Sequence, residues 1–162
     1  AKDQKVFTYT WELDPGEVPP GSRIEYDWRI VDEAGNELEV LPLTFDYEDS
    51  RFAWQTLEEG NIILSWYGSS EREARRLLDY ATKSLARLQD EMGVTLDKPV
   101  DIYVYQSKSD MSLALPRQSE TYDERTITLG MVIDKATLLL LGPHPDVELT
   151  IAHELTLSLI HI

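Results

Sequence analysis

Residues 61–93, NIILSWYGSSEREARRLLDYATKSLARLQDEMG, decide the fold because they join a strand to a long amphipathic helix. The apolar run at residues 61–67 predicts the strand. Ser69 and Ser70, with the acidic residues that follow, predict the cap and first turn of the helix, and Gly93 predicts its end. Apolar residues recur between these points at steps of three and four, which predicts one buried face. They are Ala74, Leu77, Leu78, Ala81, Leu85, Leu88 and Met92.

The sequence after this helix predicts more strands and a final helix. The expected elements are a strand at 100–105, a short helix opened by Ser109 and Asp110 and ended by Pro116, a strand at 125–134, a compact apolar run at 138–141, and a helix from Val147 that Asp146 caps. Together with the first strand and helix, these elements predict an α+β fold in which a mixed sheet packs against a long amphipathic helix and a C-terminal helix.

The N-terminal part of the chain has a different pattern. Apolar and polar residues alternate with a period of two through residues 5–47, which predicts about four strands. The apolar positions are Phe7, Tyr9, Trp11 and Leu13; Ile24, Tyr26, Trp28 and Ile30; Leu38 and Val40; and Leu43, Phe45 and Tyr47. Such strands predict part of an immunoglobulin-like or fibronectin-like β-sandwich, which normally has about seven strands. We expect this incomplete module to occupy residues 1–50 and a second domain to occupy residues 51–162, with the polar residues 48–51 at the boundary.

Composition narrows the classes of function. With 15 basic and 30 acidic residues the chain has a formal charge of −15, which repels phosphate backbones and argues against nucleic-acid binding. No cysteine is present, so any metal must be held by His, Asp or Glu. No stretch approaches the roughly 20 apolar residues that span a bilayer, and the pattern of a signal peptide is missing from the N-terminus.

The final predicted helix carries the one segment with catalytic potential, the sequence HELTL at 153–157. In zinc peptidases a helix carries His-Glu-x-x-His, because side chains four residues apart share a face and can bind one ion. Here Leu157 stands at the second histidine position and has no metal-binding atom. His161 lies roughly 12 Å further along the axis than the first histidine, and His144 precedes the helix in a turn. A histidine on a mostly apolar helix is also, more often, a packed core residue.

Across nearly its whole length the chain resembles bacterial proteins in which a short immunoglobulin-like region precedes a gluzincin-like, peptidase MA-type domain. The segments that carry the resemblance are GSRIEYDWRIVDEAGNELE at 21–39, FAWQTLEEGNIILSWYG at 52–68, the amphipathic helix from Glu71, VDIYVYQSKSDM at 100–111 and TIAHELT at 150–156. The resemblance implies a zincin-like fold in a secreted or cell-surface protein, with zinc as the cofactor and a polypeptide as the substrate.

The resemblance also implies roles for single residues. His153 matches the first zinc ligand, and Glu154 matches the catalytic base that takes a proton from metal-bound water. The second ligand falls on Leu157, and a third, acidic ligand would come from later helices. An edge strand around Thr126 to Ile133 would hold an extended substrate by backbone pairing. With one ligand of three, this chain is expected to bind no zinc and to be inactive as a peptidase.

Two further hypotheses stay open beside a disabled zinc-dependent peptidase. One is a non-catalytic binding module whose β region and exposed sheet edge engage a polypeptide or another copy of the chain, and Leu157 favours it because this residue removes the metal but keeps the helix packed. The other is a purely structural domain. The C-terminal helix is apolar nearly all round, which predicts self-association of the chain through this helix.

Overall fold

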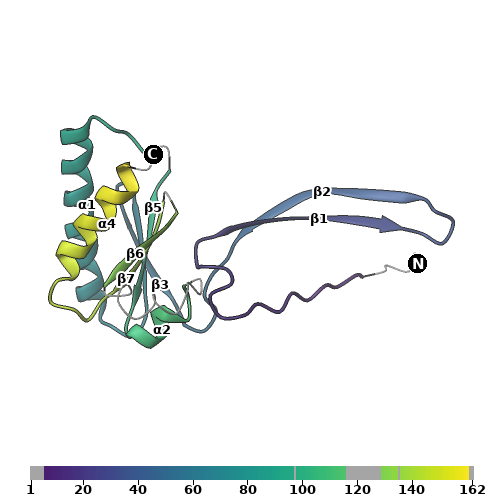
Figure 1. Ribbon diagram of the computed structural model, residues 1–162, viewed down its shortest axis with the longest axis horizontal. Coiled ribbons are helices and arrows are strands. Elements are labelled where there is room, and N and C mark those ends of the chain that lie inside the picture. The colour runs from purple at the N-terminus through teal and green to yellow at the C-terminus, as the bar shows by residue number, and fades with distance from the viewer. Residues whose placement is uncertain (1–5, 97, 116–128, 135, 161–162) are drawn as a thin grey trace, which may run out of the picture.

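The computed structural model describes residues 6–96, 98–115, 129–134 and 136–160, and these residues form two β-sheets and three helices (Figure 1). In chain order the elements are β1 (Arg23–Val31), β2 (Glu37–Asp46), β3 (Gln55–Glu59), β4 (Ile62–Trp66), α1 (Glu71–Met92), β5 (Val100–Tyr105), α2 (Lys108–Ser112), β6 (Gly130–Asp134), β7 (Thr137–Leu141) and α4 (Val147–Ile160). The predicted mixed α+β architecture is confirmed.

The larger sheet has five strands in the order β3-β4-β5-β7-β6. Its three central strands, β4, β5 and β7, are parallel, whereas β3 and β6 pair antiparallel to their neighbours at the two edges. Helix α1 makes the crossover between the adjacent parallel strands β4 and β5, as parallel pairing requires. The predicted mixed sheet is therefore present, with an antiparallel strand at each edge.

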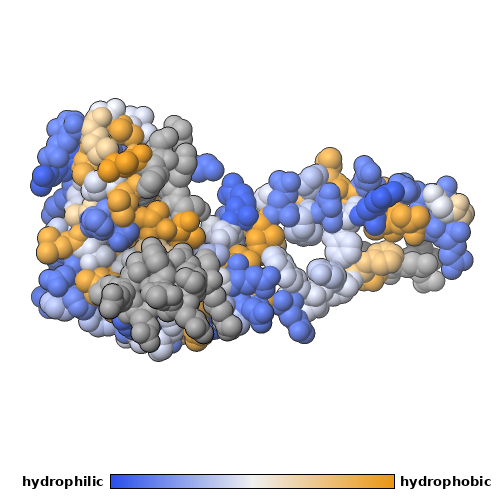
Figure 2. Space-filling model, in the orientation of Figure 1, coloured by the Kyte–Doolittle hydropathy of each residue, from blue (hydrophilic) through white to orange (hydrophobic). Residues whose placement is uncertain are grey.

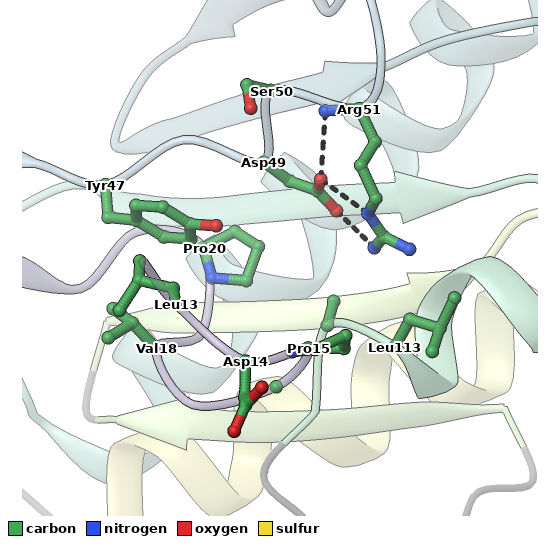
Figure 3. Close-up of a pocket in the computed structure, with 12 residues that line it drawn as sticks. Leu13, Asp14, Pro15, Val18, Pro20, Tyr47, Asp49, Ser50, Arg51 and Leu113 are labelled. Atoms are coloured by element: carbon green, nitrogen blue, oxygen red, sulfur yellow. Dashed lines mark hydrogen bonds and ion pairs between the residues drawn. The ribbon is translucent and has the colours of Figure 1, made fainter. Parts of the chain in front are cut away.

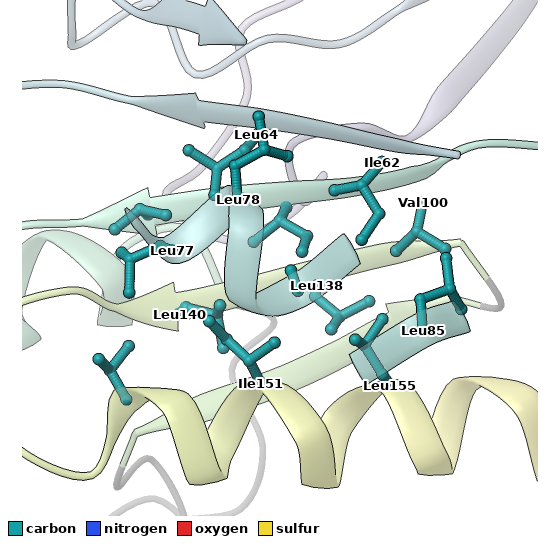
Figure 4. Close-up of a cluster of buried hydrophobic side chains, with 14 of the residues drawn as sticks. Ile62, Leu64, Leu77, Leu78, Leu85, Val100, Leu138, Leu140, Ile151 and Leu155 are labelled. Atoms are coloured by element: carbon teal, nitrogen blue, oxygen red, sulfur yellow. The ribbon is translucent and has the colours of Figure 1, made fainter. Parts of the chain in front are cut away.

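Helix α1 begins and ends at the predicted signals. The Ser70 side chain accepts a hydrogen bond from the Glu73 backbone N–H, and Gly93 adopts the left-handed conformation with φ 66°. Its apolar face packs on the sheet with residues of β4, β5, β7 and α4 (Figure 4). The largest fully buried aliphatic side chains of this core are Ile62, Leu64, Leu77, Leu78, Ile102, Leu138, Leu140, Ile151 and Leu155. Charged residues on the outer face of α1 form ion pairs with each other at one-turn spacing.

The opposite face of the large sheet has a second, more aromatic core. It is covered by α2 and by the segment that enters β3, and it contains Tyr105, Met111, Ala114, Leu115 and Leu139, with Phe52, Trp54, Tyr67 and Tyr103 packed against them. The rings of Phe52 and Tyr67 stack with centroids 3.9 Å apart. The sheet is thus buried on both faces, which explains the nearly continuous apolar runs of its central strands.

The smaller sheet is a two-stranded hairpin of β1 and β2, which extends away from the α/β part (Figure 1). Its turn is held by the Asp32 carboxylate, which accepts backbone hydrogen bonds from Ala34 and Asn36. Every residue of β2 is exposed. The predicted strands at 38–40 and 43–47 are one continuous strand, so the expectation of two separate strands there was wrong.

A β-bulge explains why the sequence pattern broke in the middle of β2. Tyr26 pairs with Leu43 and Trp28 with Val40, so one residue of β1 lies opposite two residues of β2. A bulge inserts one extra residue into a strand and shifts the alternation by one position. The extra residue lies at the Leu41-Pro42 pair, where Pro42 has no N–H to donate to the ladder.

The first predicted strand is not formed. Residues 6–13 run as an extended segment outside any sheet, and their apolar side chains, among them Tyr9 and Trp11, stay largely exposed. A sandwich needs two sheets that cover each other's apolar faces. In residues 6–50, the described part of the expected module, the one sheet is β1-β2, so a two-stranded hairpin stands in place of the expected four strands.

The predicted boundary at 48–51 is a packed junction rather than a loose linker. Asp49 is only 4% exposed, and its carboxylate accepts hydrogen bonds from the Tyr105 hydroxyl at 2.8 Å and from Arg51 Nε at 2.8 Å. Figure 3 shows this ion pair beside a pocket of about 200 Å³ at the root of the hairpin. A β-carbon on Gly21 would lie 2.8 Å from Thr137 Cγ2, so the turn before β1 packs directly on the large sheet.

Candidate functional site

The candidate site lies on α4, the predicted C-terminal helix. One face of the helix packs on β6, β7 and α1 through Val147, Thr150, Ile151, Glu154, Leu155, Ser158 and Leu159. The opposite face is open: Leu149 is 68% exposed and Ile160 is 60% exposed. His153 lies on the exposed side and Glu154 on the buried side. The expected self-association through this helix stays a prediction, and these two apolar residues are where it would occur.

His153 and Glu154 share a groove between α4 and the start of the edge strand β6. The groove has a volume of about 440 Å³ and is lined by Leu129, Gly130, Asp146, Leu149, Thr150, His153 and Glu154. It is formed where β6 crosses α4, so one wall is helix and the other is strand. The two predicted site residues are thus brought together in an accessible concave surface.

Gly130 sets the width of this groove. A β-carbon at this position would lie 2.7 Å from Thr150 Cγ2, 2.9 Å from Leu140 Cδ2 and 3.1 Å from Glu154 Cγ. No ordinary side chain fits these distances without a shift of the neighbours. The glycine therefore allows the backbone of β6 to lie directly on α4, beside the carboxylate of Glu154.

The Glu154 carboxyl group lies in an unusual environment for an acidic residue. Glu154 is 8% exposed, and this burial raises the pKa of its carboxyl group. The charge of His153 and a hydrogen bond from the Val132 backbone act in the opposite direction but do not cancel the effect of burial. A carboxyl group with a raised pKa can accept or release a proton closer to neutral pH, which is the property that a general base or acid requires.

The described residues do not provide a zinc site around this carboxyl group. Leu157 lies one turn after His153, is partly buried, and offers only hydrocarbon at the position of the second ligand. Among the residues that the structure places, no group of three or more His, Asp or Glu side chains could hold a metal ion. One imidazole does not hold zinc tightly, so the residues present do not fit the ion that the resemblance implies.

The other histidines do not complete the site. His144 lies in the turn before α4, where its Nδ1 accepts a hydrogen bond from the Asp146 backbone N–H at 3.2 Å, and it does not line the groove. His161 lies outside the described residues. The assignments of His153 as a metal ligand and Glu154 as a catalytic base therefore stay predictions.

The strand expected around Thr126 to Ile133 is present in part as β6. It forms one edge of the large sheet, antiparallel to β7, and residues 126–128 lie outside the described part of the chain. The roles of Gly130 and Thr150 in shaping the groove were not predicted from the sequence. An isolated glycine within an alternating strand signals close approach of another backbone element, and that signal was present at Gly130.

None of the known protein families, curated proteins or solved structures compared with this chain matches it. Among the described helices, none combines the length and the hydropathy needed to cross a membrane. The candidate site therefore has to be interpreted from its own geometry and chemistry.

Proposed function

We propose that the α/β part of this chain is a metallopeptidase-like domain whose zinc site is disabled, so that the chain is inactive as a peptidase in the form described. The observation that carries the proposal is the groove in which His153 and Glu154, adjacent on one helix, lie beside the backbone of the antiparallel edge strand β6. Among the described residues β6 pairs only with β7, and apart from the Val132 N–H, which bonds Glu154, its other edge can pair with an extended polypeptide.

The environment of each residue supports this proposal. His153 is exposed towards the groove side of α4, as a metal ligand must be, whereas Glu154 is buried with a raised pKa, as suits a general base. Leu157 is the residue that prevents zinc binding. It replaces the second ligand by an apolar side chain and retains the packing of the helix.

A metal titration tests the proposal directly. Zinc binding is measured by calorimetry on the wild-type chain, on a Leu157→His variant, and on a Leu157→His, His153→Ala double variant. We expect the Leu157→His variant to bind zinc at least tenfold more tightly than the wild type, since two imidazoles one turn apart can share an ion. The double variant should return to the affinity of the wild type.

Any pair of histidines one turn apart on a helix attracts zinc to some degree, so a matched control is needed. Ala86→His with Asp90→His places such a pair on the exposed face of α1, with no carboxylate one turn away along the helix, and neither residue lines the groove on α4. The repaired pair on α4 should bind more tightly than this control pair, because the Glu154 carboxylate lies beside it. Equal affinities would contradict the view that α4 carries a former metal site.

A second candidate function is non-catalytic binding of a polypeptide at the free edge of β6. The specific observation in its favour is the combination of an open groove with Leu157 at the ligand position. Hydrogen exchange with a mixture of unstructured peptides, such as a tryptic digest of casein, tests it. The amides of residues 131–133 should exchange more slowly with the peptides present, and unchanged exchange would count against this function.

A further inference from the structure

The hairpin has one apolar face that runs its whole length. Cross-strand neighbours on this face are all apolar: Ile24 with Phe45, Tyr26 with Leu43, Trp28 with Val40, and Ile30 with Leu38. The bulge in β2 shifts the spacing of its apolar residues by one position, and these residues therefore stay opposite the apolar residues of β1. Much of this face is open, since Leu38 is 60% and Leu43 is 50% exposed. Over most of its length, no described residue covers the apolar face of this amphipathic sheet.

The charged residues of the hairpin lie on its opposite face. Arg23 forms an ion pair with Asp46, and Arg29 forms one with Glu37. Each of these residues alternates along its strand with the apolar residues, so its side chain lies on the other face of the hairpin. Both arginines of the hairpin thus form ion pairs within it. Residues 6–50 hold twelve acidic and two basic residues, a formal charge of −10 out of −15 for the chain. The region formed by the hairpin and its flanking segments is therefore strongly acidic around an apolar face.

A long groove separates this hairpin from the extended N-terminal segment. Its volume is about 860 Å³, and its walls are Phe7, Thr8, Tyr9, Trp11 and Leu13 on one side and Ile24, Glu25, Tyr26, Asp27, Trp28, Phe45 and Tyr47 on the other. Figure 2 shows the open space between the hairpin and the N-terminal segment, with hydrophobic residues along both. Strand β1 pairs only with β2 among the described residues, so its other edge faces the groove.

The exposed apolar area is large enough to form an interface. Phe7, Tyr9, Trp11, Tyr26 and Phe45 are each 41–76% exposed, and such side chains bury ~150–250 Å² each when covered, so they offer on the order of 500 Å². The exposed aliphatic residues of β2 bring the total towards the ~800 Å² that one partner contributes to a standard interface. Two-stranded sheets are also only marginally stable alone, so the hairpin gains from a cover.

The acidic side chains that line the groove favour a basic occupant. Glu25 and Asp27 line it, and neither side chain forms an ion pair with a described residue. A second copy of this chain would bring another ten negative charges to the same place and would be repelled. A polypeptide with basic residues alternating with apolar ones matches both the carboxylates and the aromatic walls, and it can pair with the free edge of β1.

We propose that the groove between residues 6–13 and β1 is a docking site for an extended, basic polypeptide segment in which lysine or arginine alternates with apolar residues. The apolar side chains of the segment pack on the hairpin face. Its basic side chains lie beside Glu25 and Asp27, and its backbone adds a strand to the edge of β1. This site lies on the hairpin and is independent of the groove on α4.

Fluorescence anisotropy on the full chain tests the proposal with a labelled ten-residue peptide of alternating lysine and valine. A lysine–serine peptide of the same charge and a glutamate–valine peptide of the same apolar content are the comparison probes. We expect the lysine–valine peptide to bind at least tenfold more tightly than either. Binding should weaken as the salt concentration rises, because the attraction of exposed charges is screened.

Two pairs of variants separate specific docking from general attraction to an acidic protein. Phe45→Ser, within the groove, should weaken binding at least tenfold, whereas Val31→Ser changes an exposed apolar residue on the opposite face and should have no effect. Asp27→Lys and Glu33→Lys change the net charge equally, but only Asp27 lines the groove. Only the first of these two should weaken binding strongly. Circular dichroism confirms that each variant retains its fold.

Three results would overturn the proposal. The first is equal binding of the lysine–valine and lysine–serine peptides, which would reduce the effect to net charge. The second is binding that Phe45→Ser leaves unchanged. The third is a concentration-dependent dimer in sedimentation equilibrium that Phe45→Ser abolishes, because the occupant of the face would then be a second copy of the chain.

Discussion

Among single residues, Glu154 has the environment most favourable to chemistry, and its titration gives a testable consequence. Burial raises the pKa of its carboxyl group above the ordinary value of 4.5. The carboxyl group therefore supports folding fully only below that ordinary pKa, and this contribution is lost as the pH rises through the raised value. Glu154→Gln, which can still accept the hydrogen bond from Val132, should stabilise the chain at pH 7 by about 1 kcal/mol. Urea unfolding at several pH values measures this difference.

The pH dependence of that gain is the decisive part of the measurement. The stabilisation by Glu154→Gln should shrink towards zero below about pH 4, where the wild-type carboxyl group is also neutral. Glu58→Gln, an exposed substitution in β3, serves as the control and should change little at either pH. A gain for Glu154→Gln that stays constant across this range would show that the buried charge is not its cause.

Gly130 gives a second prediction at this scale. Gly130→Ala should destabilise the chain by about 1–3 kcal/mol, because the new methyl group overpacks the contact between β6 and α4. Thermal unfolding measures the loss. Thr150→Ser removes the methyl group that would lie 2.7 Å away, so the double variant should recover part of the stability. Full tolerance of the alanine would mean that β6 does not lie this close to α4.

Among the secondary-structure elements, the junction between β2 and β3 depends on the buried carboxylate of Asp49. Burial alone would raise the pKa of this group, but hydrogen bonds from Arg51 and Tyr105 outweigh it and hold the pKa below the usual value. Asp49→Asn should therefore cost about 2–3 kcal/mol at neutral pH. The cost should fall as the pH drops below about 4, where the unfolded chain begins to bind a proton at this carboxylate, and it should vanish as the pH falls through the lowered pKa of the folded state.

Two further variants test the role of Asp49 at this junction. Tyr105→Phe removes one hydroxyl donor but leaves the ion pair, so it should cost about 1 kcal/mol. Asp46→Asn breaks the exposed pair with Arg23 on the hairpin and should cost less than either of the other two substitutions, because solvent screens this pair. Denaturant unfolding of the three variants gives the order, and an Asp49→Asn cost no larger than that of Asp46→Asn would contradict the role assigned to Asp49.

Across the whole molecule, stability should be divided unevenly between the hairpin and the large sheet. The hairpin ladder has no buried face of its own, whereas β4, β5 and β7 lie between two cores. Hydrogen exchange should therefore be at least a hundredfold faster for amides of β1 and β2 than for those of β5. The lysine–valine peptide should slow exchange in the hairpin alone. Equal protection of both sheets in the free chain would show that the hairpin face is already covered.

The sequence by itself determined the elements whose apolar period is complete within one segment. Helix α1 with its Ser70 cap and Gly93 end, the buried central strands, and α4 with His153 and Glu154 were all predictable, because local propensity and burial agree there. The bulge in β2 was not predictable from alternation alone, since it shifts the period by one residue. The same alternation in residues 6–13 predicted a strand, but the pattern contains no information on whether a partner strand is present.

Only the tertiary structure decided which residues meet across long separations. It buried Asp49 against Tyr105, brought Gly130 onto Thr150, and left the hairpin with an open apolar face. The physical reason is that hydrogen-bond partners and close packing depend on where each element lies in three dimensions, whereas residue periodicity reports only which side of an element is apolar. The chemistry of the groove on α4 follows from that packing, because burial is what raises the pKa of Glu154.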